Sequence, residues 1–190
     1  INNLGYTADR DSYRPHLVSY LKQQESGLCA NCRHRIDANP LRVLDCKVPE
    51  CRAITETAPR LGDSLSEAAR SYFTQVLTGL DTIKIPYSLN HRLVRGLDYY
   101  NLTTFEVTAT NLGAQNAVGA GGRYDQLVET LGGPPTPAVG FAIGLERMAM
   151  LLPESTTGRA PEDLAIYVAG FGEHGTVAGL TALEELRLAG

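Results

Sequence analysis

The sequence has no long apolar run, no large excess of charge of one sign and no leader segment that we can identify. Its longest apolar stretches, 137–145 and 164–172, are about half of the ~20 residues that a membrane helix requires, so we expect no membrane span. The 17 basic and 21 acidic residues leave a net charge of -4, which argues against a protein that coats nucleic acid by bulk positive charge. The chain begins at Ile1 without a methionine or a charged segment ahead of an apolar one, so we expect a piece of a longer, cytoplasmic protein.

What is present is the composition of a soluble globular protein. Hydrophobic residues make up 43% and charged residues 20% of the 190 positions, and the mean hydropathy is -0.14. Disorder, collagen and a coiled coil are poor descriptions of such a chain. The length suits one domain, or one domain with part of a second, because domains commonly run to roughly 100 to 200 residues.

The part of the sequence before residue 83 is helical in pattern, with an interruption that holds every cysteine. Apolar spacing predicts a helix over 13–25, with Pro15 in its first turn, where proline is tolerated. The segment 27–60 shows no sustained period and is expected to be compact but irregular. Ser64-Leu65-Ser66-Glu67 fits a capping box, and the apolar stripe after it predicts a second helix that ends near Gly79.

From residue 83 onward the apolar period falls from about 3.6 to about 2, which is typical of strands. The strands that we expect lie at 83–89, 103–108, 117–122 and, fully buried, at 138–143. A short helix over 124–131 precedes the last strand, and a helix over 145–152 follows it.

The sequence after residue 152 changes in character. Residues 153–162 are rich in Pro, Ser, Thr and Gly and carry almost no apolar side chain, which predicts a linker. Beyond the linker, 164–168 has the pattern of a strand and 177–186 that of a helix. We therefore expect the opening βα unit of an α/β domain.

Three glycine-rich segments of the strand-rich half combine a permissive backbone with an arginine or a tyrosine. They are Leu-Val-Arg-Gly-Leu-Asp-Tyr-Tyr (93–100), Ala-Gly-Gly-Arg-Tyr-Asp (120–125) and Gly-Phe-Ala-Ile-Gly-Leu-Glu-Arg (140–147). A guanidinium suits a phosphate or carboxylate, and a phenol orients a polar ligand while it offers an apolar face. Taken singly, each segment also has a plain structural explanation: an ion pair beside core tyrosines, a strand-to-helix turn, or a solvent-exposed helix start.

Taken together, the three segments resemble the histidyl-tRNA synthetase family of class II aminoacyl-tRNA synthetases. The first two are similar to the family's two histidine-specific motifs and the third to class II motif 3, in the same order and spacing, while 39–47 resembles part of the bacterial insertion domain. The resemblance implies an α+β fold, which is part of the class II antiparallel-sheet catalytic domain with a mainly helical insertion domain and the start of an α/β anticodon-binding domain. The implied parts are the end of an upstream catalytic segment at 1–11, the insertion domain with its Cys-rich segment at 12–82, the catalytic core at 83–152, the linker at 153–162 and the start of the anticodon-binding domain at 163–190.

The same resemblance assigns roles to individual residues. It implies that Arg95 is the catalytic arginine, which also contacts ATP and neutralises the charge that builds up on the α-phosphate. The residues implied around the histidine substrate are Tyr99, Tyr100, Tyr124 and Gly122, and those around ATP are Arg147, Gly140 and Gly144. The implied substrates are L-histidine, ATP with Mg²⁺ and tRNA(His), and the implied full-length enzyme is a homodimer. Motifs 1 and 2 of the class lie upstream of Ile1, so we expect the chain alone to be inactive.

The four cysteines occur as Cys29-x-x-Cys32 and Cys46-x4-Cys51, and these spacings suit tetrahedral zinc. Disulfides are the weaker explanation, because no export signal is present. Two alternatives stay open: a structural zinc ion that holds the segment 27–60 together, or four reduced thiols packed as small hydrophobic side chains. Between residues 29 and 52, five basic side chains stand against three acidic ones, which indicates either a contact with tRNA phosphates or a solvated basic surface.

Two other classes of protein compete with the synthetase. A catalytically silent relative, such as the regulatory subunit of ATP phosphoribosyltransferase, would keep the fold, but by resemblance it generally lacks both the arginine at position 95 and the insertion. A zinc-ribbon interaction module with an α/β tail would require that 27–60 binds metal and that 87–150 binds no nucleotide. The four histidines form no metal-site or triad pattern, and we assign them no role.

Overall fold

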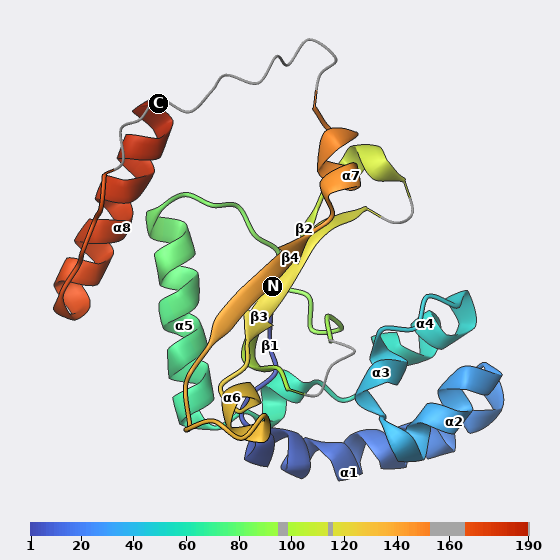
Figure 1. The fold of residues 1–190 in the computed structure, drawn as a ribbon. Helices are drawn as coiled ribbons and strands as arrows, with labels where there is room; N and C mark the ends of the chain where they lie inside the picture. Colours follow the sequence, from blue (N-terminus) through green and yellow to red (C-terminus); the bar gives the residue numbers. More distant parts are fainter. Residues whose placement is uncertain (95–98, 114–115, 153–165, 190) are drawn as a thin grey trace.

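The computed structural model describes residues 1–94, 99–113, 116–152 and 166–189 (Figure 1). At its centre is a four-stranded sheet in which each strand is antiparallel to the next. The strands follow chain order across the sheet: β1 (Asn2–Asn3), β2 (Asn101–Thr108), β3 (Ala117–Arg123) and β4 (Val139–Ile143). The predicted α+β class with an antiparallel sheet is therefore confirmed.

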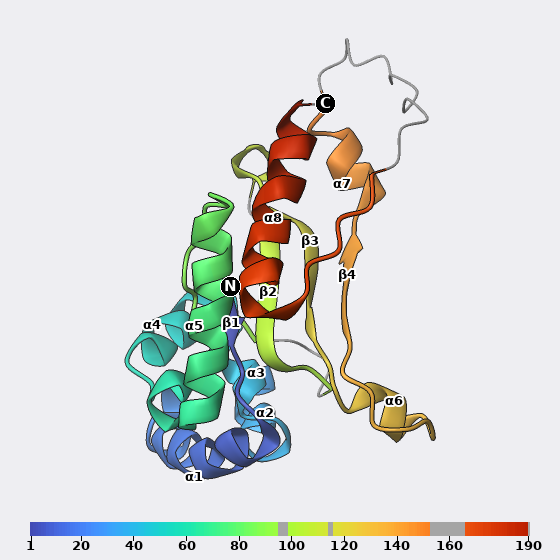
Figure 2. The same ribbon diagram turned by 90° about the vertical axis from the view of Figure 1, so that its left-hand side faces the viewer.

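Helices lie in two groups around this sheet. The first group gathers at one end of the sheet and consists of α1 (Thr7–Gln23), α2 (Ala30–Ala38), α3 (Leu41–Leu44) and α4 (Pro49–Glu56), with the 3-10 turns η1 (Glu25–Gly27) and η2 (Leu61–Ser64). The second group, α5 (Glu67–Thr82) and α8 (Gly172–Ala189), lies on one side of the sheet, as Figures 1 and 2 show together. Short elements link the later strands: η3 (Thr110–Leu112), α6 (Leu127–Thr130) and α7 (Leu145–Ala149). Over the described ranges, every helix is too short or too polar to cross a bilayer.

Helix α1 begins at Thr7, six residues before the predicted start, so Pro15 lies in its interior and not in its first turn. The earlier start has a local cause, because the Asp9 carboxylate accepts a hydrogen bond from the Tyr6 backbone N–H at 2.8 Å and satisfies a donor that the helix leaves open. The same carboxylate accepts from the Ser66 backbone N–H at 2.8 Å, which ties the beginning of α1 to the beginning of α5. Ser66, and not Ser64, is the N-cap of α5.

The segment 27–60 is helical, and the prediction that it is irregular was wrong. Its helices α2, α3 and α4 span only four to nine residues, which is too short for an apolar period to show in the sequence. They pack into one core with α1, whose members have side chains less than one-tenth exposed and include Tyr13, Leu17, Leu21, Leu28, Cys32, Ile36, Val43 and Cys51.

Residues 83–89 form no strand, and this prediction was also wrong. Helix α5 extends to Thr82, and Ile85 and Tyr87 then line a hollow between α5 and β2, which accounts for the apolar alternation. The chain meets Ile1 there, because the Ile1 amino group donates to the Ser88 carbonyl at 3.0 Å and the Asn90 N–H donates to the Ile1 carbonyl at 3.0 Å.

The strands expected at 103–108 and 117–122 are confirmed, each extended by one or two residues. The strand expected at 138–143 forms as β4, but it is exposed and not buried, with Val139 at 73% and Phe141 at 70% of full exposure. It is the last strand of the sheet, so only β3 covers its flank within the described residues. Residues 166–170 form no strand, whereas the helix expected over 177–186 is part of α8. The predicted linker at 153–162 lies outside the described residues.

Candidate active site

The two faces of the β3–β4 pair differ sharply in side-chain size. Residues that are directly paired across an antiparallel ladder point to the same face of the sheet. The pairs Ala120 with Ala142 and Gly122 with Gly140 therefore pave one face with small residues. We call these four residues the small-residue face. A flat molecule can approach the backbone closely at Ala120 and Ala142, whereas Tyr100 and Tyr124 lie against Gly122 and Gly140.

The opposite face of the sheet is apolar and is turned toward α5. The pairs Gly121 with Phe141 and Gly119 with Ile143 belong to this side. Between the sheet and α5 is a hollow of about 560 Å³ whose lining includes Tyr72, Val76, Leu80, Phe105 and Val107. This face carries the large apolar side chains of the sheet, although Phe141 at its edge is 70% exposed, so the small-residue face is the side that we consider for a polar ligand.

Three tyrosines meet at one end of the sheet. The ring centroids of Tyr99 and Tyr100 are 4.6 Å apart, and Tyr124 stands edge-on to both, at 5.6 Å from Tyr99 and 5.9 Å from Tyr100. All three side chains are half-buried. Edge-to-face contacts of this kind hold phenol rings in defined orientations.

Two glycines make room for these rings. A Cβ atom at Gly122 would lie 2.9 Å from Cδ1 of Tyr100 and 2.7 Å from the Thr103 carbonyl oxygen, and one at Gly140 would overlap the Tyr124 hydroxyl. The structure thus brings together five of the predicted residues, namely Tyr99, Tyr100, Gly122, Tyr124 and Gly140. We call the three tyrosines with these two glycines the tyrosine cluster.

A polar network that the sequence reasoning missed supports this cluster. The Arg123 Nε atom donates to both carboxylate oxygens of Asp125 at 2.8 and 2.9 Å, and the Asn101 amide donates to Asp125 at 3.0 Å. Partial burial opposes ionisation of Asp125, but the hydrogen bonds from Arg123 and Asn101 outweigh it and lower the pKa of Asp125 below its ordinary value. Arg123 also lies over the Tyr72 ring at 4.8 Å, so the loop that carries Tyr124 is anchored to α5. The order Arg123-Tyr124-Asp125 was the available sequence signal for the contact between the two charged residues. Alternate residues of an extended chain point to the same side, so these two side chains can pair on the side away from Tyr124.

Arg147 and Gly144 lie at the other end of β3. The Arg147 guanidinium donates to the carbonyl of Ala117 at 2.8 Å, and a Cβ atom at Gly144 would lie 3.4 Å from Cδ of Arg147. Because a strand advances about 3.3 Å per residue, the two ends of β3 are roughly 20 Å apart. The three predicted ATP residues that the structure describes therefore divide, with Gly140 beside the tyrosines and Gly144 and Arg147 at the far end of the strand.

The predicted catalytic residue, Arg95, lies outside the described residues. On its N-terminal side, Val94 is buried in the same core as α1 to α4. A hollow of about 330 Å³ opens beside Val94 and Tyr100, and Arg10 and Arg14 also line it. Described arginines therefore stand next to the tyrosine cluster.

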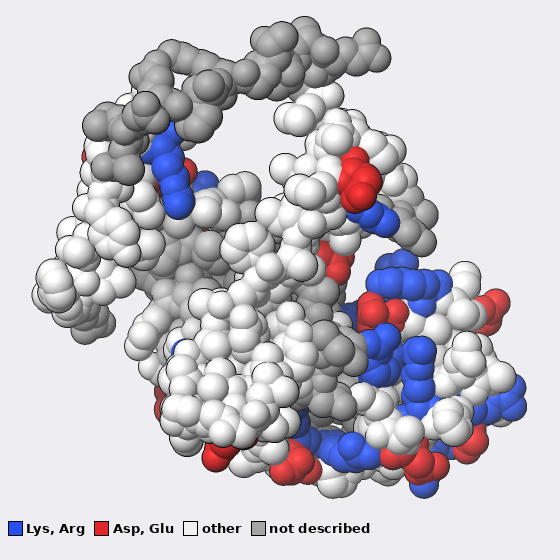
Figure 3. Space-filling view, viewed as in Figure 1, with Lys and Arg blue, Asp and Glu red and all other residues white. Residues whose placement is uncertain are grey.

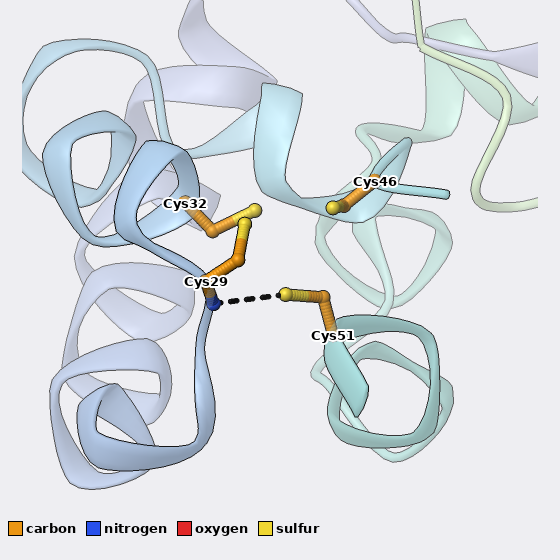
Figure 4. A group of neighbouring side chains, drawn as sticks. All are labelled: Cys29, Cys32, Cys46 and Cys51. Atoms are coloured by element: carbon orange, nitrogen blue, oxygen red, sulfur yellow. Dashed lines mark hydrogen bonds between the residues drawn. The ribbon is translucent and has the colours of Figure 1, made fainter. Parts of the chain in front are cut away.

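The four cysteines form a separate group among α2, α3 and α4 (Figure 4). All four Sγ atoms lie within 4.8 Å of one another, and they carry free thiols. A backbone hydrogen bond at Cys32 is the main cause that lowers the pKa of Cys29 to about 7; loss of solvent opposes it, and hydrogen bonds from the other three thiols add to it. Burial raises the pKa of Cys32 and that of Cys51. The spacing of these residues is visible in the sequence, but only the fold shows that the two pairs converge.

Lys and Arg side chains gather over the same helices (Figure 3). Arg33, Lys47 and Arg52 are exposed there, and Arg35 and Arg42 are half-buried. Acidic side chains are interspersed, and Lys47 is paired with Asp45 at 2.8 Å. The predicted local excess of basic residues thus lies on the molecular surface.

Comparison with known proteins gives the same family that the motifs resemble. The family model described as histidyl-tRNA synthetase matches residues 34–148, which is more than half of the chain. A histidine–tRNA ligase from Anaeromyxobacter dehalogenans (strain 2CP-1) is 48% identical over all of this chain and 46% of its own length, and one from Bordetella pertussis is 47% identical over all of this chain and 44% of its own. The crystal structure of apo S. aureus histidyl-tRNA synthetase superposes with a TM-score of 0.62 at 32% identity, covering all of this chain and 46% of that one.

The matches to the two ligases and to the crystal structure cover the tyrosine cluster, the cysteine group and Arg147, whereas the family model begins after Cys29 and Cys32. The chain spans about half the length of the curated relatives it matches. The segment that the family model matches contains β2, β3 and β4, and with them the small-residue face. The chain belongs to the histidyl-tRNA synthetase family.

Proposed function

We propose that this chain is the part of a histidine–tRNA ligase that binds L-histidine and ATP. The enzyme would join the two with release of pyrophosphate and then pass the histidyl group to tRNA(His). The observation that carries the proposal is the small-residue face, which leads from the tyrosine cluster at one end of β3 toward Arg147 at the other. An extended ligand with a ring at one end and anionic groups along its length suits such a platform.

The tyrosine cluster is the proposed site of the histidine side chain. A phenol presents an apolar ring face to an imidazole and a hydroxyl that forms hydrogen bonds with its nitrogen atoms. Tyr100 and Tyr124 stand nearly perpendicular to each other, with 84° between their ring planes, so they form two walls of a corner. Gly122 and Gly140 let these walls lie directly on the sheet.

The small-residue face is the proposed binding surface for ATP, which binds as its Mg²⁺ complex. Gly140, against which the Tyr124 hydroxyl packs, and Gly144 are the proposed glycines of this surface, and Arg147 is the proposed ligand of the phosphates. Arg95 is the proposed catalytic arginine that neutralises charge at the α-phosphate as the carboxylate of histidine attacks. Loss of one such donor typically lowers the rate by about 10²–10³-fold.

The remaining parts of the proposal concern partners. The basic side chains over α2 to α4 would contact tRNA phosphates, and the complete enzyme would be a cytoplasmic homodimer. Because its relatives are about twice as long, we expect this chain alone to make histidyl-adenylate at no useful rate.

ATP–pyrophosphate exchange in the natural polypeptide that contains this chain tests the function. We expect exchange to depend on L-histidine, and Tyr124→Ala to lower kcat/KM for histidine by about 10-fold or more, equivalent to roughly 1.4 kcal/mol. Tyr87→Ala is the matched control, because Tyr87 is outside the cluster and lines the hollow on the α5 side. Exchange that ignores histidine, or an equal loss in both variants, would refute the assignment.

A further inference from the structure

The cysteine group has the shape of a tetrahedral metal site. Four sulfur atoms around a zinc ion lie about 3.8 Å apart, because each Zn–S bond is about 2.3 Å long. The four Sγ atoms already lie within 4.8 Å of one another, so a shift of about 1 Å or less closes them on an ion. Three of the four cysteines are buried, at 0% exposure for Cys32 and Cys51 and 8% for Cys46. A ligand set made only of thiols selects zinc over the harder cations.

Two helix N-termini and one backbone N–H are directed at the sulfur atoms. Cys29 is the N-cap of the nine-residue helix α2, and Cys51 is in the first turn of the eight-residue helix α4. The positive ends of both helix dipoles therefore face the sulfur atoms (Figure 4). The Cys29 backbone N–H also donates a hydrogen bond to Sγ of Cys51 at 3.2 Å, which links the two helices.

The helices that hold the cysteines need such a link. Isolated helices shorter than about 12 residues are marginal in water, and α2, α3 and α4 are all shorter than that. Four thiols that face one another give less packing than aliphatic side chains, whereas one ion bonded to all four joins three short elements at a single point.

The same region supports the chain just before the proposed catalytic segment. Arg92 Nε donates to the carbonyl of Leu44 at 3.3 Å, two residues before Cys46. Val94 belongs to the same buried core as Cys32, Cys46 and Cys51. The position of residues 92–94 thus depends on the loop that carries Cys46.

We propose that Cys29, Cys32, Cys46 and Cys51 bind one structural zinc ion, which joins α2 to α4 and supports residues 92–94, just before the proposed catalytic Arg95. The metal part of this proposal does not depend on the proposed function, because the ligands, the helix ends and the Arg92 contact are independent of the tyrosine cluster.

Metal analysis of the 190-residue chain, purified without chelator, tests the site. We expect about one zinc per chain, displacement by Co²⁺ with the absorption of a tetrahedral thiolate complex, and loss of the metal in Cys46→Ser and Cys51→Ser. Val43→Ala is the control, because it removes buried volume from the same core and leaves all four thiols, and it should keep its zinc. Metal-free protein, a disulfide in place of two thiols, or bound iron in place of zinc would each overturn the proposal.

Hydrogen exchange before and after removal of zinc tests the support of residues 92–94. The Leu93 N–H donates to the Asn90 carbonyl at 2.9 Å and the Arg92 N–H to the Asn90 side chain at 3.1 Å, so both amides report on this segment. We expect both to exchange at least about tenfold faster without zinc, together with α2 and α4, while the amides of β3 stay unchanged. Faster exchange confined to residues 28–57 would overturn this part, and its outcome does not depend on whether the enzyme is active.

Discussion

Alanine in place of Gly140 should destabilise the protein through one identifiable collision. The added Cβ would overlap the Tyr124 hydroxyl, with the ring carbon Cζ at 3.2 Å behind it. Overpacking of this kind costs about 1–3 kcal/mol. We expect the lower end of that range, because the Tyr124 ring is half-buried and can tilt toward solvent.

Alanine substitutions at two other glycines serve as comparisons for this change in the free energy of unfolding. At Gly122 the atoms in the way are backbone, with the Thr103 carbonyl at 2.7 Å and Cα of Thr104 at 3.1 Å, so Gly122→Ala should cost about 3 kcal/mol. At Gly79, inside α5, a Cβ meets nothing within 4 Å, so Gly79→Ala should stabilise the protein by about 0.5–1 kcal/mol.

Urea unfolding followed by circular dichroism measures all three free energies of unfolding. The decisive variant is Gly140→Ala combined with Tyr124→Phe, which removes the hydroxyl that the new Cβ meets. We expect the double variant to recover about 1 kcal/mol relative to the sum of the single changes. If Tyr124→Phe gives no recovery, or if Gly140→Ala and Gly79→Ala shift stability in the same direction, the packing of the tyrosine cluster described above is incorrect.

Three further predictions concern the supports of the site. Asp125 has a lowered pKa when folded, so its contribution to stability is complete above its ordinary value of 3.8 and is lost as the pH falls through the folded value; Asp125→Asn should flatten this acid dependence in urea titrations at several pH values. Ser66→Ala should lower the free energy of unfolding by about 1 kcal/mol, because its hydroxyl accepts from the Ala69 N–H, whereas an unchanged midpoint would show that this cap contributes nothing. Leu17→Ala should cost about 2–5 kcal/mol in the same assay, because Leu17 is fully buried in the helical core, and a cost under about 1 kcal/mol would contradict that packing.

The sequence predicted the long, regular elements and erred where local and tertiary signals diverge. The strand at 117–122 could be predicted because its small residues alternate without a helical period, and β3 forms there. The strand at 83–89 was wrong, because its alternating side chains line a hollow beside α5 and have no ladder partner. Pro15 was misplaced because the Asp9 carboxylate, which accepts from the Tyr6 backbone N–H, starts α1 before the apolar pattern begins.

At the candidate site, too, the sequence predicted features that depend on neighbouring residues and missed those that depend on tertiary packing. The resemblance named Tyr100, Tyr124 and the glycines, but why glycine is required follows only from the register that sets Gly122 opposite Gly140. The cysteine spacing suggested a metal, yet the convergence of the two pairs depends on how α2 packs against α4. Asn101 lies 24 positions before Asp125, and nothing local in the sequence predicts that its amide joins the hydrogen bonds between Arg123 and Asp125.

The exposure of β4 has a practical consequence for anyone who handles this chain. As the outermost strand of the described sheet, it offers an open row of backbone donors and acceptors beside Val139 and Phe141, which is a template for pairing with another molecule. Concentrated samples should therefore aggregate through the open edge of β4, and Phe141→Lys should keep them monodisperse.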